Sequence, residues 1–127
     1  ELTAPELAGF SLAEEVPAPV LPQYQGAYHA AHTFGIQNDE VLNAIRYHTS
    51  GRPNMSTLEK VVFLSDMLEE GRDFPGIAKL RKLYYENLDE CMFYSLKCEL
   101  KHLKKSKQTI YPLTGRAFEY YKENRSK

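Results

Sequence analysis

The chain has 127 residues, of which 43% are hydrophobic and 26% charged, with a formal net charge of −1. That length suffices for one domain with one core, and the composition is typical of soluble globular proteins. No window approaches the roughly eighteen uninterrupted apolar residues that a membrane span requires. We therefore expect a soluble protein with no membrane partner.

The near-neutral total hides a charge gradient along the chain. Residues 1–50 contain six acidic residues and one basic residue, Arg46, whereas residues 75–127 contain twelve basic and six acidic residues. A basic half can attract nucleic acid, but the lysines between 97 and 105 are spaced as the solvated face of a helix. We therefore do not expect a nucleic-acid partner.

The cysteines and the beginning of the chain give two further expectations. Cys91 and Cys98 are seven residues apart in a helical stretch, roughly 10 Å along the axis, which is too far for a disulfide. Free thiols fit a reducing cytoplasm. The chain begins at Glu1 without an initiator Met or a signal-peptide pattern, and we expect it to be trimmed or a fragment.

Prolines shape the first segment. Four of the seven prolines lie in residues 1–22, so this segment is expected to be irregular apart from one short helix over 4–15. Helix formers return over 25–34. Asn38 is then the expected N-cap of a helix that ends near His48.

The rest of the chain is also expected to be helical. Ser56 and Glu59 match a capping box, which predicts a helix over 57–70. Later helices are expected over 75–87, 88–105 and 114–124, and no strand of convincing length is found. The sequence predicts an all-α fold, with one domain over 1–127 built as a bundle of short helices.

His48 and Asp66 are polar residues in apolar patterns. His48 follows Ile45 by three residues, and Asp66 follows Val62 by four, so both side chains are expected to point inward. The break at residues 51–54 lets the two helices fold back and bring these side chains together. A hydrogen-bonded pair in the core or a shared metal ion would satisfy both groups, and spacing alone favours the pair.

Two longer runs carry a specific family resemblance. The chain resembles the bacterial HD-domain family of symmetrical bis(5'-nucleosyl)-tetraphosphatases, the YqeK family, in NDEVLNAIRYHTSGRPNMSTLEKVVFLSDMLEEGRDFPGI (residues 38–77) and TIYPLTGRAFEYY (residues 109–121). The resemblance implies an HD-domain-like bundle with a di-metal centre, expected to be iron. It also implies symmetrical hydrolysis of diadenosine tetraphosphate to two ADP. Imidazole nitrogen and carboxylate oxygen suit iron, and such a centre can generate hydroxide near neutral pH.

The same resemblance implies the site residues. His48 and Asp66 would be metal ligands and catalytic residues. The implied substrate-binding residues are Thr49, Gly51, Arg52, Lys60, Arg72, Asp73 and Phe74.

Several of these residues also have a structural interpretation. Gly51 would let the backbone approach phosphate and Arg52 would offer a planar fork of donors, or both would belong to a capped turn with a solvated arginine. Arg72 would pair with phosphate or with Glu69. Phe74 would pack on a base or on the core.

The chain departs from the family's ligand set. The family's first ligand histidine and its His-Asp pair correspond to positions upstream of Glu1, and the histidine four residues before Gly-Ala-Tyr (26–28) is Pro22 here. His29 and His32 lie further along the helix and are expected at the surface. We therefore expect the fold to be incomplete at the N-terminus, the metal centre to be incomplete or empty, and this chain alone to be weak or inactive.

Three functions stay open, in this order. The first is part of a symmetrical tetraphosphatase that takes a dinucleoside polyphosphate substrate. The second is a degenerate, catalytically inactive nucleotide-binding or regulatory module. The third is a helical nucleic-acid interaction domain that uses its basic half, and a homodimer is compatible with all three.

Overall fold

The computed structural model describes residues 16 and 18–125, and within these ranges the chain is all-helical, as predicted. The helices are α2 (Leu21–His32), α3 (Asp39–Arg46), α4 (Thr57–Met67), α5 (Ile77–Glu86), α6 (Leu88–Lys105) and α7 (Pro112–Glu123). The predicted helix over 4–15 lies outside the described residues. None of the described helices is both long and apolar enough to span a membrane.

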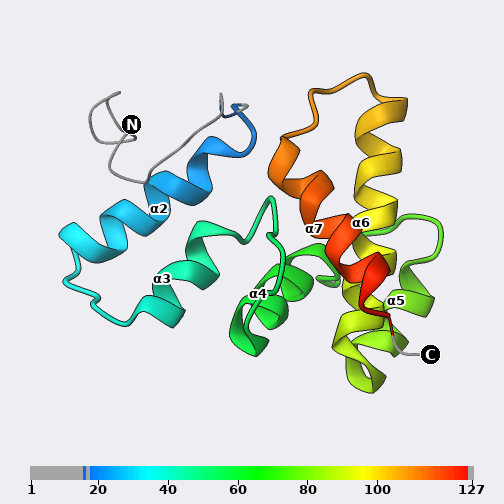
Figure 1. Cartoon of the computed structure of the whole chain (residues 1–127), viewed down its shortest axis with the longest axis horizontal. Coiled ribbons are helices and arrows are strands. Elements are labelled where there is room, and N and C mark those ends of the chain that lie inside the picture. The colour runs from blue at the N-terminus through cyan, green and yellow to red at the C-terminus, as the bar shows by residue number, and fades with distance from the viewer. Residues whose placement is uncertain (1–15, 17, 126–127) are drawn as a thin grey trace.

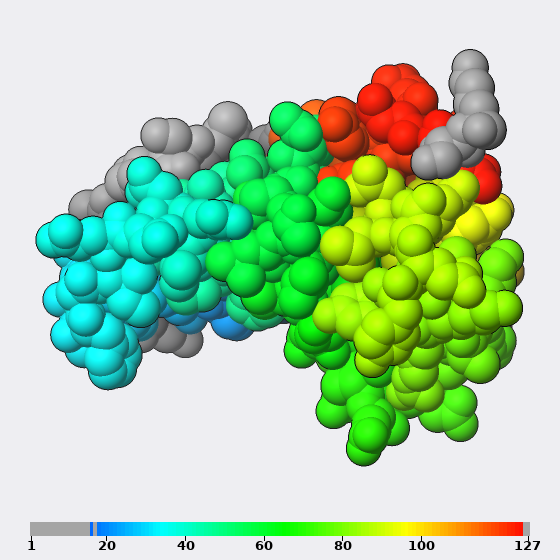
Figure 2. Space-filling model, turned by 90° about the horizontal axis from the view of Figure 1, so that it is seen from below, coloured from blue at the N-terminus to red at the C-terminus, as the bar shows by residue number. Residues whose placement is uncertain are grey.

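The helices form two groups joined by α4 (Figure 1). Helices α2 and α3 pack on each other at one end, and α5, α6 and α7 pack together at the other end. Figure 2 shows the same order from below, with the residues of α4 between the two groups. The hydrophobic core cluster lies in α4 to α7 and the loop before α4, and its most enclosed members are Leu64, Leu80, Cys91, Met92, Leu96 and Ala117.

Side-chain caps determine where three of the helices begin. The Asn38 side chain accepts a hydrogen bond from the backbone N–H three residues later, at 3.2 Å, and Asn87 does the same for α6 at 3.1 Å. Ser56 and Glu59 make both bonds of the predicted capping box, at 3.2 and 3.1 Å. The caps at Asn38 and Ser56 are therefore confirmed, and they satisfy N–H groups that the helix leaves free.

Proline and glycine place other boundaries differently from the prediction. Helix α2 begins at Leu21 and not at residue 25. The N–H groups of a first helical turn have no partner within the helix, so Pro22, which lacks an N–H, is tolerated there. The irregular segment predicted over 1–22 therefore ends earlier. Helix α7 begins at Pro112 for the same reason, whereas α5 begins only after Gly76, whose φ is 91°.

Candidate functional site

His48 lies in the turn that follows α3. The helix ends at Arg46, so His48 does not continue its apolar stripe as predicted, and its side chain is half-buried. The imidazole Nδ1 lies 2.6 Å from the backbone carbonyl of Ile45. Because a carbonyl only accepts, Nδ1 is the donor, and in the neutral form of the ring this leaves the lone pair on Nε2, the tautomer in which a histidine binds a metal through that atom.

Gln23 of α2 holds the same turn from the other side. Its side chain is fully buried, and its Oε1 accepts from the N–H groups of Thr49 and Ser50, each at 3.0 Å. Its Nε2 donates to Ser50 Oγ at 2.8 Å, and Ser50 Oγ donates to the Gly51 carbonyl at 2.9 Å. The polar groups at the centre of the turn are thus satisfied by the protein, so the turn is built in advance of any ligand.

Gly51 occupies the point where the turn meets the core. Its φ is +70°, a left-handed conformation that favours glycine, and its amide donates to the Tyr47 carbonyl at 2.9 Å. A Cβ built at this position would lie 3.7 Å from side chains of Phe63, Leu96 and Ala117. Conformation and burial therefore explain this glycine, and its role toward phosphate stays a prediction.

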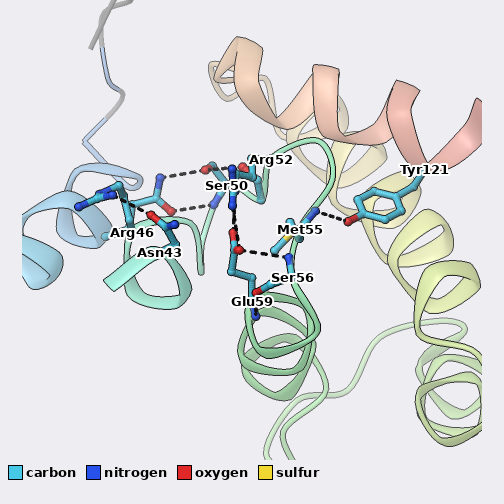
Figure 3. A network of polar contacts seen from close by, with 10 residues as sticks. Asn43, Arg46, Ser50, Arg52, Met55, Ser56, Glu59 and Tyr121 are labelled. Carbon is cyan, nitrogen blue, oxygen red and sulfur yellow. Dashed lines mark hydrogen bonds and ion pairs between the residues drawn. The ribbon is translucent and has the colours of Figure 1, made fainter. Parts of the chain in front are cut away.

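Arg52 is not the solvated arginine of the structural interpretation. Its guanidinium makes a bidentate ion pair with the Glu59 carboxylate, at 2.6 and 2.9 Å (Figure 3). It also lies over the Tyr47 ring, 4.9 Å from the ring centroid. The Glu59 side chain is only 2% exposed, against 32% for Arg52. A phosphate group at this place would have to compete with a buried carboxylate for the same donors.

The ion pair shifts the titration of both partners. Burial by itself would raise the pKa of the Glu59 carboxyl, but hydrogen bonds from Arg52 and from Ser56 outweigh burial and hold that pKa below its usual value. Hydrogen bonding to Glu59 raises the pKa of Arg52 in turn. Glu59 is therefore ionised in the folded protein at neutral pH, as the pairing requires.

Asp66 does not point inward, so that prediction is wrong. Its side chain is 57% exposed, whereas Leu64 of the same helix is completely buried. Two residues correspond to roughly 200° around a helix, which places Asp66 opposite Leu64. Its Oδ2 lies 3.7 Å from the guanidinium of the half-exposed Arg72, a loose pair in contact with solvent.

His48 and Asp66 do not form the hydrogen-bonded core pair that their spacing favoured. Among the residues that the structure describes, no hydrogen bond or ion pair joins these two, and no three His, Cys, Asp or Glu side chains gather as a metal site. Each nevertheless carries an atom of the kind that binds metals, Nε2 in the neutral imidazole of His48 and the carboxylate of Asp66, which is only loosely paired with Arg72. The two residues suit a divalent metal as part of a ligand set, with further ligands needed to complete it.

The positions around α2 add no ligand. Pro22 lies in the first turn of α2, where proline has neither a side-chain donor nor an acceptor. His29 and His32 are exposed, as predicted, and the ring of His32 stacks on Tyr28 at a centroid distance of 4.2 Å.

The remaining predicted substrate-binding residues lie in different surroundings. Lys60 donates to Asp89 of α6 at 2.8 Å, and Asp73 is exposed. Arg72 and Phe74 line one cavity of about 440 Å³ beside α6. Phe74 also packs against the hydrophobic core, in agreement with its structural interpretation.

Comparison with known proteins finds relatives that share one name. Over 89 residues the chain is 43% identical to "Bis(5'-nucleosyl)-tetraphosphatase, symmetrical" of Bacillus subtilis (strain 168) and 46% identical to the protein of that name from Halalkalibacterium halodurans. Each match covers 70% of this chain and 48% of the relative. The chain is a relative of the symmetrical bis(5'-nucleosyl)-tetraphosphatases. A protein of the same name from Staphylococcus aureus is 37% identical over 92 residues, which are 71% of this chain and 47% of that relative.

A solved structure supports the same assignment. The crystal structure of a predicted HD superfamily hydrolase from Clostridium acetobutylicum, described as involved in NAD metabolism, matches with a TM-score of 0.76 at 31% identity. The match covers 98% of this chain and 62% of that one, which confirms an HD-domain-like fold. No protein family model matches the chain. The chain spans about half the length of the curated tetraphosphatases that it matches.

Proposed function

We propose that this chain forms part of a metal-dependent hydrolase that cleaves dinucleoside tetraphosphates symmetrically, releasing two ADP from diadenosine tetraphosphate. The observation that carries the proposal is the identity of 43–46% with relatives named for this activity. The anchored imidazole of His48 supports it, because a metal-binding histidine commonly donates its other ring N–H to a backbone carbonyl.

In this proposal His48 and Asp66 hold metal together with ligands from beyond the described residues. Metal ions held there, which we propose to be iron, would supply a means to form hydroxide near neutral pH and to neutralise phosphate charge. Other residues of the chain hold the turn that carries His48, through the Ile45 carbonyl and the Gln23 side chain. The Asp66 carboxylate is exposed to solvent, where a metal can reach it. Arg72 lies 3.7 Å from Asp66, and in this proposal its guanidinium binds a phosphate of the substrate.

We also propose a setting for this reaction. The two cysteines are free thiols, which favours a reducing cytoplasm. A homodimer stays a prediction, and light scattering of the purified protein measures it directly.

Product analysis tests the activity. The protein encoded by the complete reading frame that contains this chain is loaded with Fe²⁺, incubated with diadenosine tetraphosphate, and the nucleotides are separated by anion-exchange chromatography. ADP is expected as the only nucleotide product. ATP together with AMP would contradict symmetrical cleavage, and unchanged substrate with a fully loaded metal centre would overturn the proposal.

Ligand variants test the two assigned residues. His48→Gln and Asp66→Asn are each expected to lower kcat by more than about a hundredfold and to reduce bound metal, because each removes a donor atom. His29→Gln and Asp39→Asn are matched controls, since both residues are exposed and belong to other parts of the surface. Full activity and metal content in Asp66→Asn would exclude this residue as a ligand.

A catalytically inactive nucleotide-binding module is the second candidate. Pro22 favours it, because the family resemblance places a ligand histidine at this position. Metal analysis separates the two candidates: an enzyme is expected to hold two metal ions per chain, whereas the module would bind ADP without metal. In the first case Pro22→His raises metal affinity, and in the second it has no effect on ADP binding.

A further inference from the structure

We propose that Glu59 is a positioning residue of the candidate site. Through its ion pair with Arg52 it fixes the turn after α3 against α4, the two parts of the chain that carry His48 and Asp66. This inference rests on the proposed function, because it concerns the residues that we propose to hold metal. It gives Glu59 a role that the family resemblance does not imply, and it gives Arg52 a partner in the protein in place of the implied phosphate.

Arg52 connects the ion pair to the turn of His48. Its guanidinium lies 4.9 Å from the centroid of the Tyr47 ring, and Tyr47 directly precedes His48. A guanidinium is attracted to the face of an aromatic ring. The Tyr47 carbonyl also accepts from the Gly51 amide at 2.9 Å, which ties together the two sides of the turn. A displacement of Arg52 would therefore release contacts of the residue next to His48.

Glu59 connects the same ion pair to α4. Its buried carboxylate accepts from the Ser56 amide at 3.1 Å, as part of the capping box that begins the helix. Asp66 follows Glu59 by seven residues, or about 700° of helix, so both lie on nearly the same face of α4, about 10 Å apart along its axis. The ion pair holds this face toward the turn, and it thereby sets the direction in which Asp66 leaves the helix.

The ion pair is more than the capping box requires. The cap uses Oε2 of Glu59, whereas Arg52 donates to both carboxylate oxygens, at 2.6 and 2.9 Å (Figure 3). A buried ion pair adds little net stability compared with apolar side chains of similar size, but two parallel hydrogen bonds allow only one arrangement of the partners. Such a pair therefore suits a place where geometry matters more than stability.

A contact between Arg52 and a substrate phosphate is the competing explanation. In that case Glu59 competes with the phosphate for the same guanidinium, and removal of the Glu59 charge would free the guanidinium and lower KM. In the positioning role, removal of that charge leaves every substrate contact in place and displaces the metal-binding atoms. The two explanations therefore differ in what Glu59→Gln does to KM and to metal binding.

Metal binding is the first test, and it needs no turnover. Mn²⁺ is titrated by calorimetry into the metal-free protein encoded by the complete reading frame that contains this chain. Glu59→Gln is expected to lower the Mn²⁺ affinity by about tenfold or more, which is the usual effect of losing a residue that orients a metal ligand. Unchanged affinity would overturn the inference.

Ser56→Ala is the matched control for this titration. It removes the bond from the Glu59 amide to Ser56 Oγ, and it keeps both the ion pair and the bond from the Ser56 amide to the carboxylate. This variant is expected to bind Mn²⁺ as the wild type does. Equal losses of affinity in the two variants would show a general effect of weakening the start of α4 and would overturn the inference.

Steady-state kinetics with diadenosine tetraphosphate is the second test. For the Fe²⁺-loaded protein, Glu59→Gln is expected to lower kcat and kcat/KM equally, by about tenfold or more, because the lost positioning affects the reacting geometry and not the binding of substrate. A lower KM would instead support the phosphate contact of Arg52 and overturn the positioning role.

A double variant keeps the test valid if a single change prevents folding. Arg52→Gln leaves the Glu59 carboxylate buried without its partner, whereas Arg52→Gln combined with Glu59→Gln removes both charges. Because both residues act through one ion pair, the double variant is expected to lose no more Mn²⁺ affinity than Glu59→Gln alone. Circular dichroism checks the fold of each variant. Losses that multiply would mean separate roles and would overturn the inference.

The proposed function and this inference fail in different ways. A wild type that neither binds Mn²⁺ nor cleaves diadenosine tetraphosphate would overturn both. A wild type that binds and cleaves, together with a folded Glu59→Gln variant that has the same metal affinity and the same kcat, would overturn the positioning role alone.

Discussion

The turn that carries His48 depends on one buried side chain, Gln23, which no local pattern in the sequence singles out. Its side-chain amide accepts hydrogen bonds from the backbone N–H groups of Thr49 and Ser50 and donates one to the Ser50 hydroxyl. These partners lie 26 and 27 residues away in the sequence. Partners so distant in the chain are brought together only by the packing of α2 against α3.

Gln23→Ala is expected to lower the free energy of unfolding by about 3 kcal/mol, because buried donors of the turn lose their acceptor. Gln37→Ala, at an exposed position, is the control and should stay within about 0.5 kcal/mol of the wild type. Urea denaturation measures both. Equal values for the two variants would mean that the Gln23 hydrogen bonds contribute nothing net.

The Arg52–Glu59 pair predicts a pH dependence with a definite sign. The folded pKa of Glu59 lies below the ordinary value of 4.5, so the pair stabilises fully above pH 4.5 and this stabilisation is lost as the pH falls through the folded pKa. In Arg52→Gln, the Glu59 carboxylate stays buried without its strongest partner. Protonation of this carboxylate then removes the cost of an unpaired buried charge in the variant. The deficit of the variant relative to wild type is therefore expected to be large at pH 7 and smaller at pH 4.

Urea denaturation at the two pH values measures this deficit. Lys104→Gln removes an exposed charge from another helix and serves as the control. A deficit that grows as the pH falls would contradict the assigned direction of the Glu59 pKa.

Helix α4 illustrates stabilisation at the scale of one element. Its capping box links Ser56 and Glu59 in both directions, and Glu59 is at the same time the partner of Arg52. Ser56→Ala is expected to lower the free energy of unfolding by about 1 kcal/mol, as the loss of an N-cap usually does. Thr57→Ala changes the next, exposed residue and should have little effect, and thermal melting compares the two.

Local sequence signals were sufficient to predict the all-α fold class and most of the described helices. Caps act within four residues, so Asn38 and Ser56 could be recognised from the sequence. Proline in a first turn gives an ambiguous signal, because it both begins helices and interrupts them, and the start of α2 at Leu21 was missed for that reason.

The direction of the two candidate ligands could not be obtained from periodicity. Asp66 shares a helical spacing with Val62, but tertiary packing decides which stripe of α4 faces the core, and the buried stripe centres on Phe63 and Leu64. His48 follows the end of α3, where helical spacing no longer applies. The assignment of these residues as a ligand pair therefore rests on the family resemblance and stays a prediction.

The whole molecule consists of two helix groups with unequal cores. The members of the main core cluster come from residues 55–121, and α2 and α3 contribute none of them. The group of α2 and α3 contacts the other helices where α3 packs on α4, and Gln23 of α2 bonds to Ser50 in the loop before α4. A hydrogen bond of 3.0 Å between the hydroxyls of Tyr24 and Tyr111 is a further link. A unit with fewer buried contacts opens at lower free energy than the core.

Hydrogen exchange is expected to show this difference, with amides of α2 and α3 exchanging faster than those of the central turns of α6. Tyr24→Phe removes the hydroxyl bond to Tyr111 and should speed exchange in α2 while leaving α6 unchanged. Tyr85→Phe, at a side chain that is 87% exposed, is the control. Uniform exchange across all helices would mean that the protein opens as one unit.

The Met55 amide, seven residues after His48, donates to the hydroxyl of Tyr121 near the end of the last helix, at 2.9 Å (Figure 3). The segment between the two candidate ligands is thus fastened by a residue 66 positions further along the chain. While Tyr121 is still inside the exit tunnel, a nascent chain lacks this contact, so the finished geometry of the segment is reached only after α7 has left the ribosome.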